Sequence, residues 1–76
     1  MSPEARRILQ VFAGRSAGHT IMPWDFGDAI VWEAGYIRDE PVRLGFVELL
    51  EGEYIIEHPA GIELSSRGEQ ILRNLV

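Results

Sequence analysis

The residues able to do chemistry in this chain are few and poorly spaced for it. His19 and His58 lie far apart, and neither stands at metal-ligand spacing from another His or Cys. Asp25 and Asp28 are three positions apart and could share a cation, but no further oxygen ligands converge on them in the sequence. The chain contains no cysteine, which excludes disulfides and thiolate metal sites. The sequence predicts no catalytic residues, no cofactor and no metal.

Composition places the chain among small globular domains. Its 76 residues allow one hydrophobic core, so we expect a single domain over residues 1–76. A hydrophobic fraction of 46% is too high for a disordered segment. Gly, Pro, His or Asp interrupts each uncharged stretch, and an amphipathic pattern stands where a signal peptide would have an apolar run. We therefore expect a cytoplasmic protein without a membrane span.

The first elements are a helix and a short strand. Ser2 is a suitable N-cap and Pro3 a suitable first residue, so a helix is predicted from Pro3 to the glycine stop at Gly14. A short strand can follow over residues 19–22. The apolar face of this helix repeats at i, i+3, i+4 and i+7, through Ala5, Ile8, Leu9 and Phe12.

A second helix is predicted from Pro23 to about Glu33, with Gly35 as the glycine that stops it. Gly27 weakens this helix by about 1 kcal/mol relative to alanine. At 100° per residue, its buried face consists of Phe26, Ala29 and Ile30, and its far side consists of Asp25, Asp28 and Trp32.

A third helix follows, capped by Asp39 or Glu40, with Pro41 in its first turn and Gly52 at its end. Its apolar stripe consists of Val42, Phe46, Leu49 and Leu50. Because this stripe is expected to face the core, another face of the helix is exposed to solvent. That outer face consists of Arg43, Leu44, Val47, Glu48 and Glu51.

The last third of the chain predicts a β-hairpin and a final helix. Strands are expected over residues 53–58 and 62–65, joined by a tight turn at Pro59-Ala60-Gly61. Ser66-x-x-Glu69 has the form of a capping box for a helix whose apolar residues are Ile71, Leu72 and Leu75.

This order of elements resembles the winged helix-turn-helix fold. The resemblance covers nearly the whole chain and is sharpest in Leu50-Glu51-Gly52-Glu53-Tyr54-Ile55 and in Ile62-Glu63-Leu64-Ser65-Ser66-Arg67-Gly68. The first segment is similar to the end of the recognition helix in MarR- and PadR-like regulators. The second is similar to the start of the helix that follows their wing, although Ser65 replaces the usual threonine. The resemblance implies an α+β, mostly α fold: a three-helix core, a β-hairpin wing and a C-terminal helix.

The charge distribution opposes the DNA binding that this resemblance implies. Residues 23–64, which include the elements that would face DNA, carry ten acidic residues and two arginines, a net charge of −8. The two terminal segments carry +3 of the total of −5. Affinity for nucleic acid comes largely from neutralising phosphates, and a DNA-binding domain is expected to be basic.

Two hypotheses remain open. The first is a protein–protein interaction module: a regulatory adaptor, a small subunit or a phage- or plasmid-type inhibitor whose partner has a basic surface. Its candidate binding residues are Asp25, Asp28, Trp32, Arg43, Leu44, Val47, Glu48 and Glu51.

The alternative is a DNA-binding transcriptional regulator that contacts phosphates through Arg15, Arg38 and Arg43. The chain would then act as a homodimer formed through its terminal helices, whereas the first hypothesis permits a monomer or a homodimer.

Overall fold

The first helix, α1 (Pro3–Gln10), begins at the predicted residue but ends before the predicted stop at Gly14. The computed structural model describes residues 1–30, 32–33 and 36–75, with the backbone alone for residues 28, 32 and 33. The Ser2 hydroxyl caps α1 by accepting the Ala5 N–H at 3.1 Å. Every residue of the predicted apolar face, including Phe12 just beyond the helix, is fully buried. Turns over residues 11–18 lead to the short strand β1 (Thr20–Ile21).

The prediction of an α-helix from Pro23 to Glu33 is wrong. This segment forms a 3₁₀ helix, η1 (Pro23–Ala29), in which Gly27 has φ 61° and ψ −134°. Such a backbone conformation is open to glycine and strained for other residues, so an α-helix cannot continue through it. The chain then extends into β2 (Trp32–Glu33), which pairs with β3 (Tyr36–Ile37). Phe26 and Ile30 are buried as predicted, and Ala29 is half-buried.

Helix α2 (Glu40–Glu51) has the predicted limits. Asp39 is its N-cap and accepts the Val42 N–H at 3.2 Å, and Gly52 is its C-cap. Gly45 allows α2 to approach α1 closely, because a Cβ atom at this position would lie 2.7 Å from the Ala5 nitrogen. The predicted stripe faces inward, with Val42, Phe46 and Leu49 buried and Leu50 half-buried.

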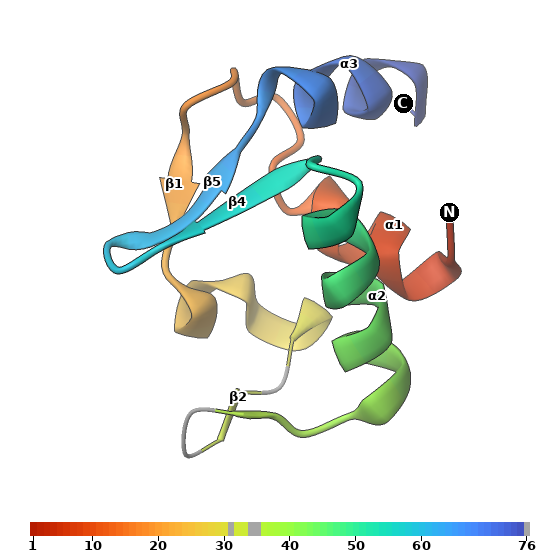
Figure 1. Ribbon diagram of the computed structural model, residues 1–76, viewed down its shortest axis with the longest axis vertical. Coiled ribbons are helices and arrows are strands. Elements are labelled where there is room, and N and C mark those ends of the chain that lie inside the picture. The colour runs from red at the N-terminus through yellow and green to blue at the C-terminus, as the bar shows by residue number, and fades with distance from the viewer. Residues whose placement is uncertain (31, 34–35, 76) are drawn as a thin grey trace.

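A hairpin of β4 (Ile55–His58) and β5 (Gly61–Leu64) follows α2. The hairpin loop is Pro59-Ala60, since His58 pairs with Gly61, so Gly61 belongs to β5 and not to the predicted turn. β5 also pairs with β1, which gives an antiparallel sheet in the order β1-β5-β4 (Figure 1). β4 begins two residues later than predicted, and β5 keeps its predicted length but lies one residue earlier in the chain.

Helix α3 (Ser66–Leu75) closes the chain, but its cap lies one residue earlier than predicted. Ser65, not Ser66, accepts the Gly68 N–H, at 2.9 Å. Glu69 does not complete a capping box. Its carboxylate accepts the Ala17 N–H and pairs with Arg73 at 2.8 Å.

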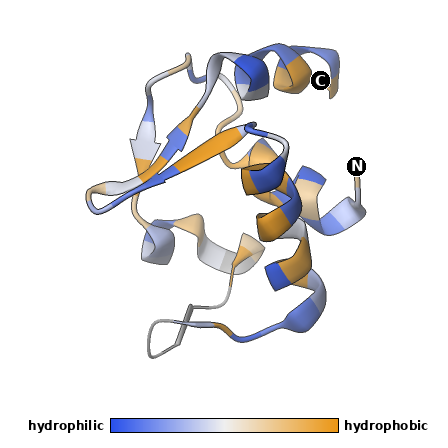
Figure 2. Cartoon of the chain, viewed as in Figure 1, coloured by the Kyte–Doolittle hydropathy of each residue, from blue (hydrophilic) through white to orange (hydrophobic). Residues whose placement is uncertain are grey.

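The core lies between the helices and the inner face of the sheet. Figure 2 shows hydrophobic residues within α1 and α2 and at the start of β4. The result is an α+β fold, in which the described residues form three α-helices, one 3₁₀ helix, a three-stranded antiparallel sheet and a two-stranded ribbon. Its buried apolar residues are Ala5, Ile8, Leu9, Phe12, Phe26, Ile30, Val42, Phe46, Leu49, Ile55, Ile62, Leu64 and Leu72.

Candidate partner-binding surface on helix α2

Four of the predicted partner-binding residues lie together on the outer side of α2. Leu44, Val47, Glu48 and Glu51 line one shallow hollow of about 620 Å³. They occupy the helix positions left outside once Val42, Phe46 and Leu49 turn toward the core. We call this surface the α2 hollow; its remaining lining residues are Met1, Gly52 and Tyr54.

The α2 hollow combines exposed apolar area with carboxylates. The Leu44 side chain is 54% exposed and Met1 is 45% exposed, while Val47 is half-buried. Such area on a small domain is a feature of binding surfaces when polar residues surround it. Here the surrounding polar residues are the acids Glu48 and Glu51.

Glu48 is held in place by the start of α1. Both of its carboxylate oxygens accept the Ser2 N–H, at 3.2 and 3.3 Å. A carboxylate beside the first turn of a helix is favoured by the partial positive charge there. Glu51, by contrast, is exposed, and its carboxylate is available to a partner.

Arg43 does not belong to the α2 hollow. Its guanidinium pairs with Glu40 on the same helix, with Nη2–Oε1 at 2.6 Å and Nε–Oε2 at 3.0 Å. This hydrogen-bonded pair raises the pKa of Arg43 and lowers the pKa of Glu40 below its ordinary value. The one basic side chain of α2 is therefore balanced by a neighbouring acid.

The second predicted patch is not built in the way the sequence suggested. Asp25, Asp28 and Trp32 were expected on one side of an α-helix, but the first two lie in the kinked η1 and Trp32 lies in β2, so no α-helix carries all three. Asp25 is exposed on η1. The side chains of Asp28 and Trp32 lie outside the described residues, so their role stays a prediction.

Sequence reasoning missed Trp24. Its position in η1 leaves Trp24 65% exposed. Together with Met22 and Pro23 it lines an apolar hollow that extends to His58 and Pro59 at the hairpin turn. The sequence Pro23-Trp24 does not predict that Trp24 is exposed, because the exposure depends on the 3₁₀ geometry of η1.

The arginines of the DNA-binding hypothesis come from separate places. Arg15 lies in the turn after α1, in a hollow that it shares with Arg73 of α3. Arg38 is exposed just before α2, and Arg43 is paired with Glu40. Neither Arg15 nor Arg38 lines the α2 hollow.

The two histidines have neighbours that give no catalytic arrangement. His58 Nε2 lies 2.5 Å from Glu63 Oε1 across the exposed face of the hairpin. The His19 ring meets Phe12 edge-on, with centroids 6.3 Å apart. Within residues 1–30, 32–33 and 36–75, no three His, Asp or Glu side chains gather as metal ligands.

Among the helices that the structure describes, none has both the length and the apolar character needed to cross a bilayer. No protein-family model, curated protein or solved structure matches this chain.

Proposed function

We propose that this chain is a non-catalytic winged-helix module that binds another protein through the α2 hollow. The order α1, β1, η1, α2, β4, β5, α3 supports the winged-helix part of the proposal. It repeats the order inferred from the resemblance, with η1 in place of the second α-helix and the β2–β3 ribbon as an addition. α2 then stands where the recognition helix would be.

The observation that carries the proposal is the chemistry of the outer side of α2. Leu44 and Val47 offer apolar area there, next to Glu48 and Glu51. An interface of this kind gains affinity from burying the apolar centre and specificity from the charges around it. A regulatory adaptor, a small subunit and a phage- or plasmid-type inhibitor would all use such a surface, facing a basic patch on the partner.

The same surface is poorly suited to phosphates. α2 carries three glutamates and one arginine, and that arginine is already paired with Glu40. A duplex would have to break this pair and would also face the carboxylates of Glu48 and Glu51. The second candidate function, a DNA-binding regulator, is favoured only by the element order.

The protein-binding function is tested by photo-crosslinking inside the source cell. A benzoylphenylalanine residue replaces Leu44 in one variant and Gln70, an exposed residue of α3, in another. We expect the Leu44 probe to give one specific crosslinked protein, to be identified by mass spectrometry, and the Gln70 probe to give none. Equal crosslinking from both positions would contradict the proposal.

Affinity for the identified partner is then measured with two variants of equal charge. Leu44→Asp should weaken binding at least tenfold, about 1.4 kcal/mol, because it places a charge at the centre of the interface. Gln70→Asp should bind as the unmodified chain does. Both variants should keep the circular dichroism spectrum of the parent.

The DNA-binding alternative has a separate test. Random-sequence duplex is titrated at low and at moderate salt against the unmodified chain and against Arg43→Ala. We expect no binding by either protein. Tight binding that falls steeply with salt and is lost in Arg43→Ala would establish the alternative and overturn the proposal.

A further inference from the structure

A second surface, separate from the α2 hollow, lies between η1 and the turn of the hairpin. It is the hollow of about 480 Å³ that contains Trp24, and we call it the Trp24 hollow. Residues 22–24 form one side of it, and residues 57–59, 61 and 62 of the hairpin form the other. The α2 hollow shares none of these residues, so each surface can be changed without altering the other.

Close packing of the two segments forms the floor of the Trp24 hollow. β1 pairs with β5 and leads into η1, which brings η1 beneath the hairpin (Figure 1). Gly61 permits this approach, because a Cβ atom there would lie 2.9 Å from the Ile21 carbonyl oxygen and 3.1 Å from Met22 Sδ. Ile62 is buried and Met22 is half-buried, so the floor is apolar and is held by the sheet.

The Trp24 ring forms one wall of this hollow and is accessible to a ligand. Tryptophan is highly buried on average, yet more than half of this side chain is in contact with solvent. Within the described part of the chain, its ring stacks on no other aromatic or cationic side chain. The face of an indole ring attracts cations more strongly than the faces of the other aromatic side chains do.

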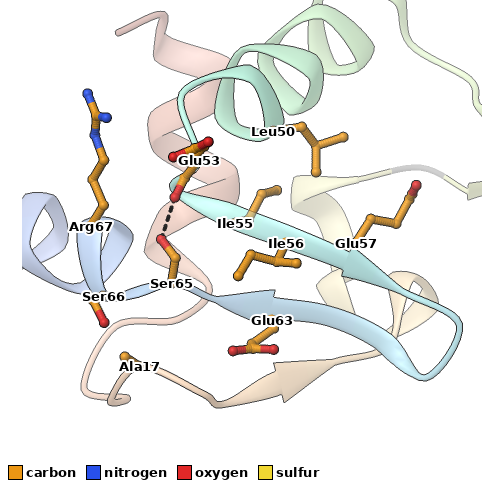
Figure 3. Close-up of a pocket in the computed structure, with 10 residues that line it drawn as sticks. All are labelled: Ala17, Leu50, Glu53, Ile55, Ile56, Glu57, Glu63, Ser65, Ser66 and Arg67. Atoms are coloured by element: carbon orange, nitrogen blue, oxygen red, sulfur yellow. Dashed lines mark hydrogen bonds between the residues drawn. The ribbon is translucent and has the colours of Figure 1, made fainter.

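Glu57 adds a carboxylate on the core-facing side of the sheet. It pairs with Ile62, and directly paired residues project from the same face. Figure 3 shows Ile55 and Glu57 on one side of β4 and Ile56 on the other. Ile55 and Ile62 are buried, whereas Glu57 lies at the edge of the core and is exposed. No basic side chain among the described residues pairs with its carboxylate.

His58 does not balance this charge. Successive residues of a strand point to opposite faces, so the His58 ring lies on the outer face of the hairpin, where it contacts Glu63. The lining of the Trp24 hollow contains neither Lys nor Arg. Asp25, next to Trp24 in the sequence, is a further exposed acid. The hollow therefore combines an aromatic face and an apolar floor with uncompensated negative charge.

These features favour a flat cation as the occupant. A guanidinium group is planar, stacks on aromatic faces and donates two parallel hydrogen bonds to one carboxylate. An ammonium group is compact and strongly hydrated, so it gains less from an apolar floor. Glu57 and Asp25 would repel a phosphate. The net charge of −5 on each copy of this chain also opposes a second copy as the source of the cation.

We propose that the Trp24 hollow binds an arginine side chain of a partner protein. The guanidinium stacks on the Trp24 ring and pairs with Glu57, while the methylene groups of the arginine contact Met22 and Pro59. This contact is additional to the α2 hollow and does not require it.

The probe is a capped pentapeptide with one arginine between glycines, titrated against the ¹⁵N-labelled chain by nuclear magnetic resonance. We expect the indole N–H signal of Trp24 and the amide signal of Glu57 to shift. The amide signals of Glu48 and Glu51 should keep their positions. The Trp24 indole signal is identified by its absence from the spectrum of Trp24→Leu. Shifts confined to the α2 hollow would overturn the proposal.

Analogues of the peptide separate the charge of the guanidinium from its shape. Citrulline has nearly the same shape without the charge, so it should bind about fivefold more weakly or worse. Lysine keeps the charge without the planar group and should bind about twofold more weakly or worse. Citrulline that binds as tightly as arginine would overturn the proposal. Equal binding of lysine and arginine would overturn the assignment to arginine.

Two substitutions remove the two parts of the site. Trp24→Leu keeps an apolar side chain without the ring, and Glu57→Gln keeps the size of the side chain without its charge. Each should weaken the arginine peptide about fivefold, and Trp24→Phe, with a weaker aromatic face, should stay within about threefold of the unmodified chain. Because both positions are exposed, the variants should keep the dispersed amide spectrum of the parent. Unchanged affinity in Trp24→Leu or Glu57→Gln would overturn the proposal.

Glu51→Gln is the matched control for Glu57→Gln. It removes the same charge from an exposed residue of the α2 hollow and should change the affinity for the peptide less than about twofold. Equal losses from Glu51→Gln and Glu57→Gln would indicate general charge attraction and overturn the proposal. Leu44→Asp should bind the peptide as the unmodified chain does, which separates this inference from the proposed function.

The unmodified chain without peptide tests the source of the arginine. The Trp24 indole signal should keep its width and position as the protein concentration rises. Broadening or shifting of this signal with concentration would identify a second copy of the chain as the occupant and overturn the assignment to a partner protein.

Discussion

Ser65 shows how one hydroxyl joins two parts of the chain. It donates to the Glu53 carbonyl at 2.6 Å, before β4, and accepts the Gly68 N–H at 2.9 Å, inside α3. The first turn of α3 thereby lies directly against the start of the hairpin. Gly68 is required for this contact, since a Cβ atom there would lie only 2.0 Å from the Tyr54 carbonyl oxygen.

Replacing Ser65 by alanine should therefore cost about 1–2 kcal/mol of unfolding free energy, through loss of the N-cap. The matched control is Ser66→Ala, at an exposed position in the first turn of α3, which should stay within about 0.5 kcal/mol of the parent. Urea unfolding followed by circular dichroism measures both. A larger loss of stability from Ser66→Ala than from Ser65→Ala would identify Ser66 as the N-cap, as the capping-box pattern predicted.

At the scale of elements, η1 is where a local pattern misleads. Residues 23–33 have an apolar repeat typical of a helix, but Gly27 adopts φ 61° and ψ −134°. A Cβ atom at Gly27 would meet no other atom within 4 Å, so the restriction comes from the backbone alone. The turn at Gly27 still buries Phe26 and Ile30, while the chain leaves the helix for β2.

This geometry reverses the effect expected of a common stabilising substitution. In an α-helix, Gly27→Ala would add about 1 kcal/mol of stability. Here it should destabilise the chain by about 1–3 kcal/mol, because an L-residue is strained at this backbone conformation.

The control for Gly27 is a D-alanine at the same position in a chemically synthesised chain. A D-residue at the dihedral angles of Gly27 is equivalent to an L-residue with the opposite signs, which is an ordinary extended conformation, so D-alanine fits without strain. Compared with glycine, it also reduces the conformational freedom of the unfolded chain. Its thermal midpoint should equal or exceed that of the parent. A midpoint raised by L-alanine and lowered by D-alanine would show that residues 23–29 are α-helical after all.

The whole molecule depends on one small core. It has no disulfide, and among the described residues no buried side-chain polar atom lacks a hydrogen bond. Phe12 lies in this core, fully buried, with its ring edge-to-face against Phe26 at a centroid distance of 5.7 Å. A domain of this size has about 3–5 kcal/mol of stability to lose.

Phe12→Ala should consequently leave most of the molecules unfolded at 25 °C, because a Phe-to-Ala cavity costs about 3–5 kcal/mol. Phe12→Leu, which keeps most of the volume, should cost about 1.5 kcal/mol or less and remain folded. Dispersion of amide signals in a nuclear magnetic resonance spectrum distinguishes these states. A well-dispersed spectrum from Phe12→Ala would mean that the core contributes less than its burial implies.

Local sequence alone determined α1, α2, the hairpin and α3, because helix caps and apolar repeats act over three or four residues. The Ser2 and Asp39 caps and the Gly52 stop are confirmed. The same periodicity also placed Arg43, Leu44, Val47, Glu48 and Glu51 on one outer face, and the structure brings all of these except Arg43 into one hollow.

Tertiary structure decided what depends on contacts between distant segments. The conformation of Gly27, the exposure of Trp24 and the Ser65 contact to Glu53 follow from how segments meet, and no repeat in the sequence encodes them. β5 becomes the central strand of the sheet only because β1, far away in the chain, pairs with its other edge. Sequence periodicity determines on which side of its helix or strand a residue lies. The packing of helices and strands determines which other residues that side contacts.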